Sequence, residues 1–99
     1  MNFSRTDQDH ATVFRIEGEL DAVTAPELRL PFDTLVAEGR ERIVLDLSEL
    51  RLIDSSGVGA IVSLYKRVRA NGGHVKVVGV NDQPAAIFQL LRLDKVFAE

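Results

Sequence analysis

The chain has 99 residues, of which 45% are hydrophobic and 27% charged, so its composition is that of one folded domain and excludes a disordered tail. It contains no cysteine, which excludes a disulfide framework, a Cys-ligated zinc site and a thiol nucleophile. The net charge of -3 argues against a nucleic-acid partner, and no apolar run approaches the roughly 20 residues that cross a bilayer. We therefore expect a single soluble, cytoplasmic domain over residues 1–99 that binds neither nucleic acid nor membrane.

The first 20 residues predict a β-hairpin. Residues 1–6 are a weak strand candidate, and a polar turn follows at residues 7–10. Residues 12–20 alternate between apolar and polar side chains, which is typical of a half-buried strand. Its expected inward face consists of Phe14, Ile16, Gly18 and Leu20.

The next segment predicts a helix that ends at Gly39. Thr24 and Glu27 have the spacing of a capping box, and Pro26 suits the first turn, where a missing N–H costs nothing. Pro31 lies inside the helical pattern, so we expect a kink or a break there. The apolar stripe of this helix consists of Leu28, Phe32, Leu35 and Val36.

The middle of the chain predicts a strand and a second helix. Residues 42–47 contain a continuous apolar run, which is typical of a strand buried on both faces. The helix follows Asp54 and ends before Gly72. Its basic last turn indicates a solvated helix end more than a docking site for an acidic partner. This turn carries Lys66, Arg67 and Arg69, and the expected apolar face consists of Val58, Ile61, Val62, Tyr65 and Val68.

The last third predicts a strand, a helix and a short final strand. Residues 75–80 are dense in valine, and Asn81 or Asp82 can cap a third helix with Pro84 in its first turn. Residues 95–97 are expected to form the final strand. The order β-β-α-β-α-β-α-β indicates an α/β domain with a mixed sheet and right-handed crossovers. The third helix is expected to turn inward Ile87, Leu90 and Leu91.

The richest local feature is the segment Asp54-Ser55-Ser56-Gly57, here called the DSSG motif, at a strand-to-helix junction. Its structural explanation is a helix start, in which Asp54 or one of the two serines caps the first turn. However, Gly57 and Gly59 each weaken that turn by about 1 kcal/mol relative to alanine. The glycines also leave the serine hydroxyls unshielded, so a group from another molecule can reach them.

The sequence does not favour catalysis, a metal or a cofactor. Ser56 is not in a G-x-S-x-G elbow, and the two histidines, His10 and His74, have no spacing that places them beside it. The glycines of residues 57–59 match neither a dinucleotide fingerprint nor a P-loop. No cluster of carboxylates and histidines indicates a metal site. We therefore expect a protein that is not an enzyme.

Taken together, three segments resemble the STAS family, which includes the bacterial anti-sigma factor antagonists. They are residues 18–21 (GELD), residues 43–47 (IVLDL) and residues 53–59, which contain the DSSG motif. The resemblance extends over nearly the whole chain, and the DSSG motif is its specific part. It implies one STAS domain over residues 1–99, with helices packed mainly on one face of a mixed sheet.

The resemblance also implies a regulatory binding protein that is switched by phosphorylation. In that family the second serine of the motif, here Ser56, accepts phosphate from a serine kinase that is also the anti-sigma factor. The unmodified antagonist binds this kinase and so releases a sigma factor, and a metal-dependent serine/threonine phosphatase resets the switch. Asp21 matches the acidic loop residue near the acceptor. The partner surface is then expected to consist of Asp21, Asp54, Ser55, Ser56, Gly57 and Val58.

Two alternatives stay open. One is an accessory subunit of a lipid-transport ABC system or of a larger signalling complex, although such relatives often carry threonine at the position of Ser56. The other is an enzyme with Ser56 as its nucleophile, which labelling by a serine-reactive phosphonate would reveal. Family members also commonly carry a further C-terminal helix that the residues up to Glu99 do not provide. We therefore expect part of the sheet to be exposed, or covered in a homodimer.

Overall fold

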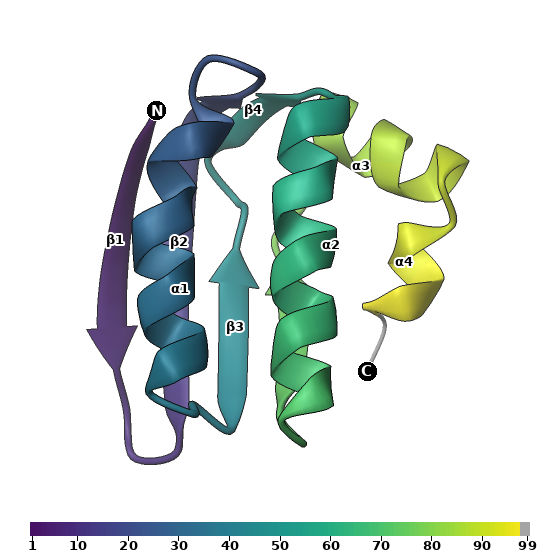
Figure 1. Cartoon of the computed structure of the whole chain (residues 1–99). Helices are drawn as coiled ribbons and strands as arrows, with labels where there is room; N and C mark the ends of the chain where they lie inside the picture. The colour runs from purple at the N-terminus through teal and green to yellow at the C-terminus, as the bar shows by residue number, and fades with distance from the viewer. Residues whose placement is uncertain (98–99) are drawn as a thin grey trace.

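Five strands form one mixed sheet in the computed structural model, which describes residues 1–97 (Figure 1). The strands are β1 (Asn2–Asp7), β2 (Ala11–Leu20), β3 (Arg42–Asp46), β4 (Leu50–Ile53) and β5 (His74–Val78). Their order is β1-β2-β3-β5, with β1 antiparallel to β2 and the other pairs parallel. Because β2 is ten residues long, its first half pairs with β3 and its last residues pair with β4.

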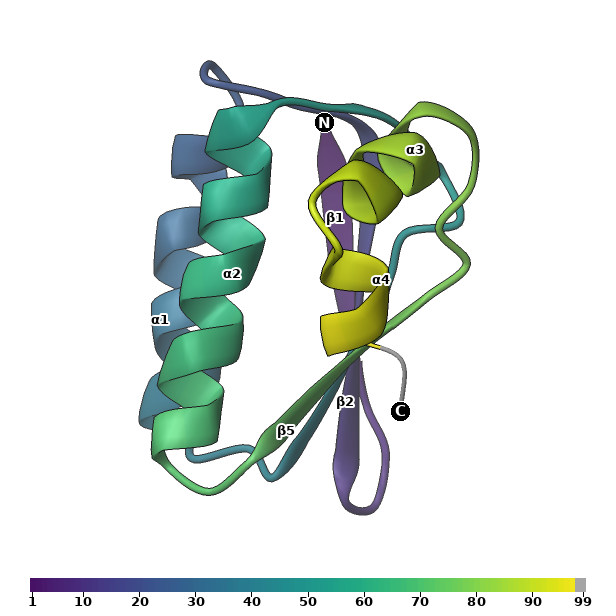
Figure 2. The same ribbon diagram turned by 90° about the vertical axis from the view of Figure 1, so that its right-hand side faces the viewer.

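The first two α-helices of the chain lie side by side on one face of the sheet, whereas the two C-terminal helices lie at the edge of the sheet beyond the second helix (Figures 1 and 2). The helical elements are the 3-10 helix η1 (Ala25–Leu28), α1 (Arg29–Ala37), α2 (Ser55–Ala70), α3 (Asp82–Leu90) and α4 (Leu93–Val96). The α/β class, the mixed sheet and the placement of helices mainly on one face are thus confirmed.

The core lies between the sheet and the pair α1 and α2. The predicted hairpin and the alternation of β2 are confirmed, because Phe14, Ile16 and Leu20 are buried beneath the helices. The ring of Phe14 meets that of Phe32 on α1 edge-on, with centroids 5.3 Å apart. On β3, by contrast, only Ile43 and Leu45 are buried and Val44 is half-buried, so the expected burial of both faces is wrong.

The first helix changes from 3-10 to α geometry after Leu28 and continues through Pro31, so the expected break at Pro31 is wrong. The segment begins as η1 and becomes α-helical at Arg29, which makes Pro31 the third residue of α1. A proline in the first turn removes an N–H that would have had no partner within α1. The change from 3-10 to α geometry therefore leaves Pro31 where a helix tolerates it.

The C-terminal segment differs from its prediction in two ways. Residues 95–97 do not form a strand, because the helix α4 occupies Leu93–Val96 and Phe97 is buried after it. The ring centroid of Phe97 lies 5.3 Å from that of Tyr65 and 6.0 Å from that of Phe88. Of the expected inward face of α3, Ile87 packs against the core, but the two leucines do not. Leu90 and Leu91 are 76% and 51% exposed, whereas Pro84 and Phe88 are the buried residues of α3.

The strand β4, which the sequence does not mark as separate from β3, is fixed by a side chain of α3. The N–H of Ile53 donates to Gln83 Oε1, and Gln83 Nε2 donates to the carbonyl oxygen of Ile53, both at 2.9 Å. The Gln83 amide therefore pairs with the free side of β4 as a neighbouring strand would. This contact sets the position of the residue that follows, Asp54.

Gln83→Leu is expected to lower the free energy of unfolding by about 2 kcal/mol, because it leaves both polar groups of the Ile53 backbone without partners in a partly buried place. The measurement is urea denaturation followed by circular dichroism. Gln89→Leu, at an exposed position of the same helix, is the matched control and is expected to change stability little. Equal midpoints for the two variants would show that the Ile53 contact does not stabilise the fold.

Candidate functional site

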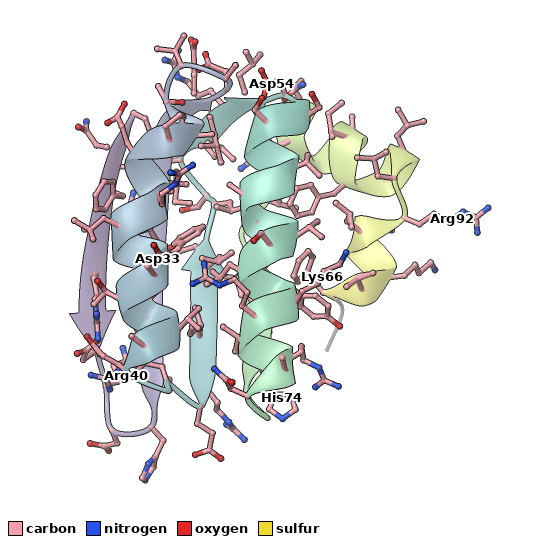
Figure 3. The ribbon with its side chains drawn as sticks, viewed as in Figure 1. Asp33, Arg40, Asp54, Lys66, His74 and Arg92 are labelled. Atoms are coloured by element: carbon pink, nitrogen blue, oxygen red, sulfur yellow. The ribbon has the colours of Figure 1, made fainter. Side chains whose placement is uncertain are left out.

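The DSSG motif begins α2, and the carboxylate of Asp54 caps this helix (Figure 3). Asp54 has an extended backbone, and its Oδ1 accepts from the N–H of Ser56 at 2.9 Å and from the N–H of Gly57 at 3.1 Å. The sequence left open which residue of the motif caps the helix, and the structure assigns Asp54. The two serines that follow are therefore free of a capping role, and both are exposed.

The same carboxylate reaches the loop of residues 21–24, which connects β2 to η1. Asp54 Oδ2 accepts from the N–H of Ala22 at 3.2 Å, and the N–H of Asp54 donates to the carbonyl oxygen of Leu20 at 3.1 Å. Two segments that lie more than 30 residues apart in the sequence are thus joined at the start of α2. Asp21 belongs to this loop, so the structure brings the two predicted acidic residues into adjoining segments.

Within the loop, Asp21 and Thr24 bind each other, which makes the predicted capping box wrong. Asp21 Oδ1 accepts from the N–H groups of Val23 at 2.9 Å and of Thr24 at 3.0 Å. The Thr24 hydroxyl donates to the carbonyl oxygen of Glu19 at 2.9 Å instead of capping η1. The N–H of Thr24, and then that of Val23, lower the pKa of the Asp21 carboxyl, because they stabilise its charged form. Asp21 is therefore anionic at neutral pH and holds the loop in shape.

Ser56 lies on the wall of a groove of about 510 Å³ between α1 and α2, which we call the α1–α2 groove. Its lining includes Ala22, Arg29, Asp33, Ser56, Ala60 and Arg67. Across the groove, Arg67 Nη1 on α2 donates to Asp33 Oδ1 on α1 at 2.8 Å (Figure 3 shows Asp33 on α1). The hydroxyl of Ser56 is therefore accessible from solvent and lies beside a depression that another molecule can enter.

The two glycines near the motif have different surroundings. Gly57 is buried, and a Cβ atom built on it would lie 2.7 Å from Leu20 Cγ and from the Leu20 carbonyl oxygen, and 2.8 Å from Ile53 Cγ1. Gly57 thus permits the close approach of α2 to β2 and β4. Gly59 is exposed and has open space around its Cα atom, so only this glycine leaves the surface open. Val58 is half-buried against the core.

Sequence reasoning missed the residues that α1 and its loop contribute to this site. Ala22 acts through its backbone, which no side-chain pattern reveals. Arg29 and Asp33 line the groove because α1 lies beside α2, and this arrangement is set by the tertiary fold and not by local sequence. The one available signal was helical spacing, since Ser56, Ala60 and Arg67 recur at intervals of four and seven residues and share one side of α2.

The remaining candidate side chains lie apart from the site. His74 Nδ1 lies 2.9 Å from Arg69 Nη1 at the far end of α2 (Figure 3 shows His74 there). Within residues 1–97 no group of three or more His, Asp or Glu side chains is arranged to hold a metal ion. None of the helices in the same range has the length and apolar character required to cross a membrane.

Residues 2–99 match the profile of the STAS domain. The chain belongs to the STAS domain family. The expected family is thereby confirmed. Because the match covers nearly the whole chain, the DSSG motif and the α1–α2 groove are features of a STAS domain in this protein.

Several proteins similar to this chain are named anti-sigma factor antagonists. The anti-sigma-B factor antagonist of Listeria monocytogenes is 33% identical to this STAS domain over 92 residues, which are 91% of this chain and 78% of that protein. The Staphylococcus aureus protein of the same name is 29% identical over 93 residues, or 94% and 86% of the two chains. The crystal structure of an anti-sigma factor antagonist from Mycobacterium paratuberculosis superposes with a TM-score of 0.87 at 29% identity and covers 97% of this chain and 81% of that one.

Proposed function

We propose that this STAS domain is an anti-sigma factor antagonist that binds an anti-sigma factor through the surface around the DSSG motif and is switched off when Ser56 is phosphorylated. The similar proteins of Listeria monocytogenes and Staphylococcus aureus, which carry that name, support the role. Ser56 is chosen as the phosphate acceptor because its side chain is exposed at the second position of α2, on the wall of the α1–α2 groove.

In the phosphorylation step, the catalytic residues belong to the kinase. Ser56 Oγ attacks the γ-phosphorus of ATP, the bond between that phosphorus and the β,γ-bridging oxygen breaks, and ADP leaves. The hydroxyl proton passes to a base of the kinase. A phosphatase reverses the modification by hydrolysis and releases inorganic phosphate. This chain supplies only the acceptor hydroxyl, held at a helix start whose backbone is fixed by Asp54.

The proposed partner surface consists of Asp21, Asp54, Ser55, Ser56, Gly57 and Val58. In it Gly57 acts through the backbone shape it permits, because it is buried. Phosphorylation adds about -1.5 to -2 charges beside the Asp54 carboxylate, at a surface where the partner is shaped for a small hydroxyl. Like charges brought together across an interface cost several kcal/mol. The phosphorylated protein therefore loses its partner without having to unfold.

The test is phosphate transfer from the anti-sigma factor kinase of the host with labelled ATP. The unaltered protein is expected to take up one phosphate and Ser56→Ala none. Ser63→Ala, which changes another exposed serine in the same groove, serves as the matched control and is expected to be labelled like the unaltered protein. Undiminished labelling of Ser56→Ala would contradict the choice of Ser56. Capture of a transporter ATPase in place of a serine kinase would instead favour an accessory subunit.

A further inference from the structure

The start of α2 has few free donors for a phosphate on Ser56. The N–H groups of Ser56 and Gly57 both donate to Asp54 Oδ1, and the N–H of Val58 donates to the Asp54 carbonyl oxygen at 2.9 Å. To use the N–H groups of Ser56 and Gly57, the phosphate would have to displace the Asp54 carboxylate, which also accepts from the N–H of Ala22. A phosphoserine at position 56 therefore meets the negative charge of Asp54 and needs a cation from elsewhere.

The α1–α2 groove contains two arginines, and among residues 1–97 only one of them has an anionic partner. Arg67 donates to Asp33 at 2.8 Å. Arg29 is exposed and, within the described part of the chain, makes no ion pair and no side-chain hydrogen bond. It lines the same groove as Ser56, together with the small side chains of Ala22 and Ala60, which leave room for an anion. Arg29 is also the first residue of α1, so the change from 3-10 to α geometry after Leu28 fixes its backbone beside the groove.

We propose that Arg29 binds the phosphate of phosphorylated Ser56 across the mouth of the α1–α2 groove, an inference that rests on the proposed function. A guanidinium presents two parallel N–H groups to two phosphate oxygens, which gives both charge neutralisation and direction. This contact offsets the repulsion between the phosphate and Asp54, so the cap of α2 and its bond to Ala22 stay intact. It also holds the phosphate in the groove. The docking surface is then blocked by a phosphate that Arg29 holds in one position, and not by a phosphate that moves freely in solvent.

The test uses protein in which phosphoserine is placed at position 56 by chemical ligation, so that it does not depend on any kinase. Phosphorus NMR then follows the second ionisation of the phosphate against pH. A nearby cation stabilises the dianion, so Arg29→Gln is expected to raise this pKa by roughly half a pH unit, the size typical of an exposed ion pair. Arg29→Lys is expected to restore part of the shift. Arg92→Gln removes an equal charge from a side chain that points away from α2 (Figure 3) and is expected to leave the value unchanged.

The outcomes separate the two proposals. Equal phosphate pKa values in the unaltered protein and in Arg29→Gln would overturn the role of Arg29, even if the kinase labels Ser56. A raised value in Arg29→Gln, alongside a failure of every kinase to label Ser56, would leave the contact established and overturn the proposed function. A rise of the same size in Arg92→Gln would show that only the net charge matters and would also overturn the specific contact. The unphosphorylated Arg29→Gln protein is expected to melt like the unaltered one, because Arg29 has no partner to lose within residues 1–97.

Discussion

Gly57→Ala is expected to lower the free energy of unfolding by about 3 kcal/mol, the upper part of the usual range for adding a methylene-sized group to a tightly packed core. The new Cβ atom would lie 2.7 Å from a backbone oxygen of Leu20, which cannot rotate away as a side chain can. The start of α2 must therefore move outward from β2 and β4. Chemical denaturation measures the loss, and the slope with denaturant tests whether the folded state stays compact.

Gly59→Ala is the matched control, because it makes the same chemical change two residues further along the helix. Nothing lies within 4 Å of the added Cβ atom at this position. Alanine is the better helix former by about 1 kcal/mol, so this variant is expected to be more stable than the unaltered protein. Opposite signs for the two substitutions are the expected result. A loss of stability in both would mean that helix propensity and packing do not account for these glycines.

Ser56→Asp is expected to reduce the affinity for the anti-sigma factor by about a hundredfold, which corresponds to about 2.7 kcal/mol. A carboxylate at this position adds negative charge beside Asp54 in the proposed docking surface, where like charges and lost solvation oppose association. The melting temperature is expected to change little, since the side chain is exposed and the positive end of the helix dipole offsets the repulsion from Asp54. Isothermal titration calorimetry measures the affinity, and differential scanning calorimetry measures the melting temperature.

The control for this substitution is Asn71→Asp, which adds the same charge at the other end of α2, about 22 Å away along the helix. It is expected to leave the affinity within about twofold, because charges more than two Debye lengths apart are screened at physiological salt. A hundredfold loss of affinity in both variants would show that the net charge of the protein, and not the position of the added charge, weakens binding. Unchanged affinity in Ser56→Asp would show that the anti-sigma factor does not bind at the surface around Ser56.

The elements predicted from the sequence are those whose signals are local. The alternation in β2 and the valine-rich β5 depend on the residues within each strand, and both are present in the structure. The start of α2 at the DSSG motif was also predictable, because Asp54 caps through atoms two and three residues away.

The predictions that are wrong concern places where another part of the fold decides. The side of α3 that packs on β4 carries Pro84 and Phe88, which are buried. Leu90 lies outside this side and is exposed, although its apolar character predicted burial. The Thr24 hydroxyl donates to the carbonyl oxygen of Glu19, and the N–H of Glu27, which this hydroxyl was expected to cap, donates to the backbone oxygen of Thr24 instead. Arg29 precedes Ser56 by 27 positions in the sequence, and only the packing of α1 beside α2 places both residues in the lining of one groove.

The side-chain amide of Gln83 has a consequence for the behaviour of the protein in a crowded cell. An unpaired strand edge is a template on which a foreign strand can add, and such pairing leads to aggregation. At Ile53 both backbone groups on that edge are already engaged by the protein itself. The proposed docking surface, which begins one residue further on at Asp54, therefore does not adjoin free backbone groups at Ile53 on which a foreign strand could add.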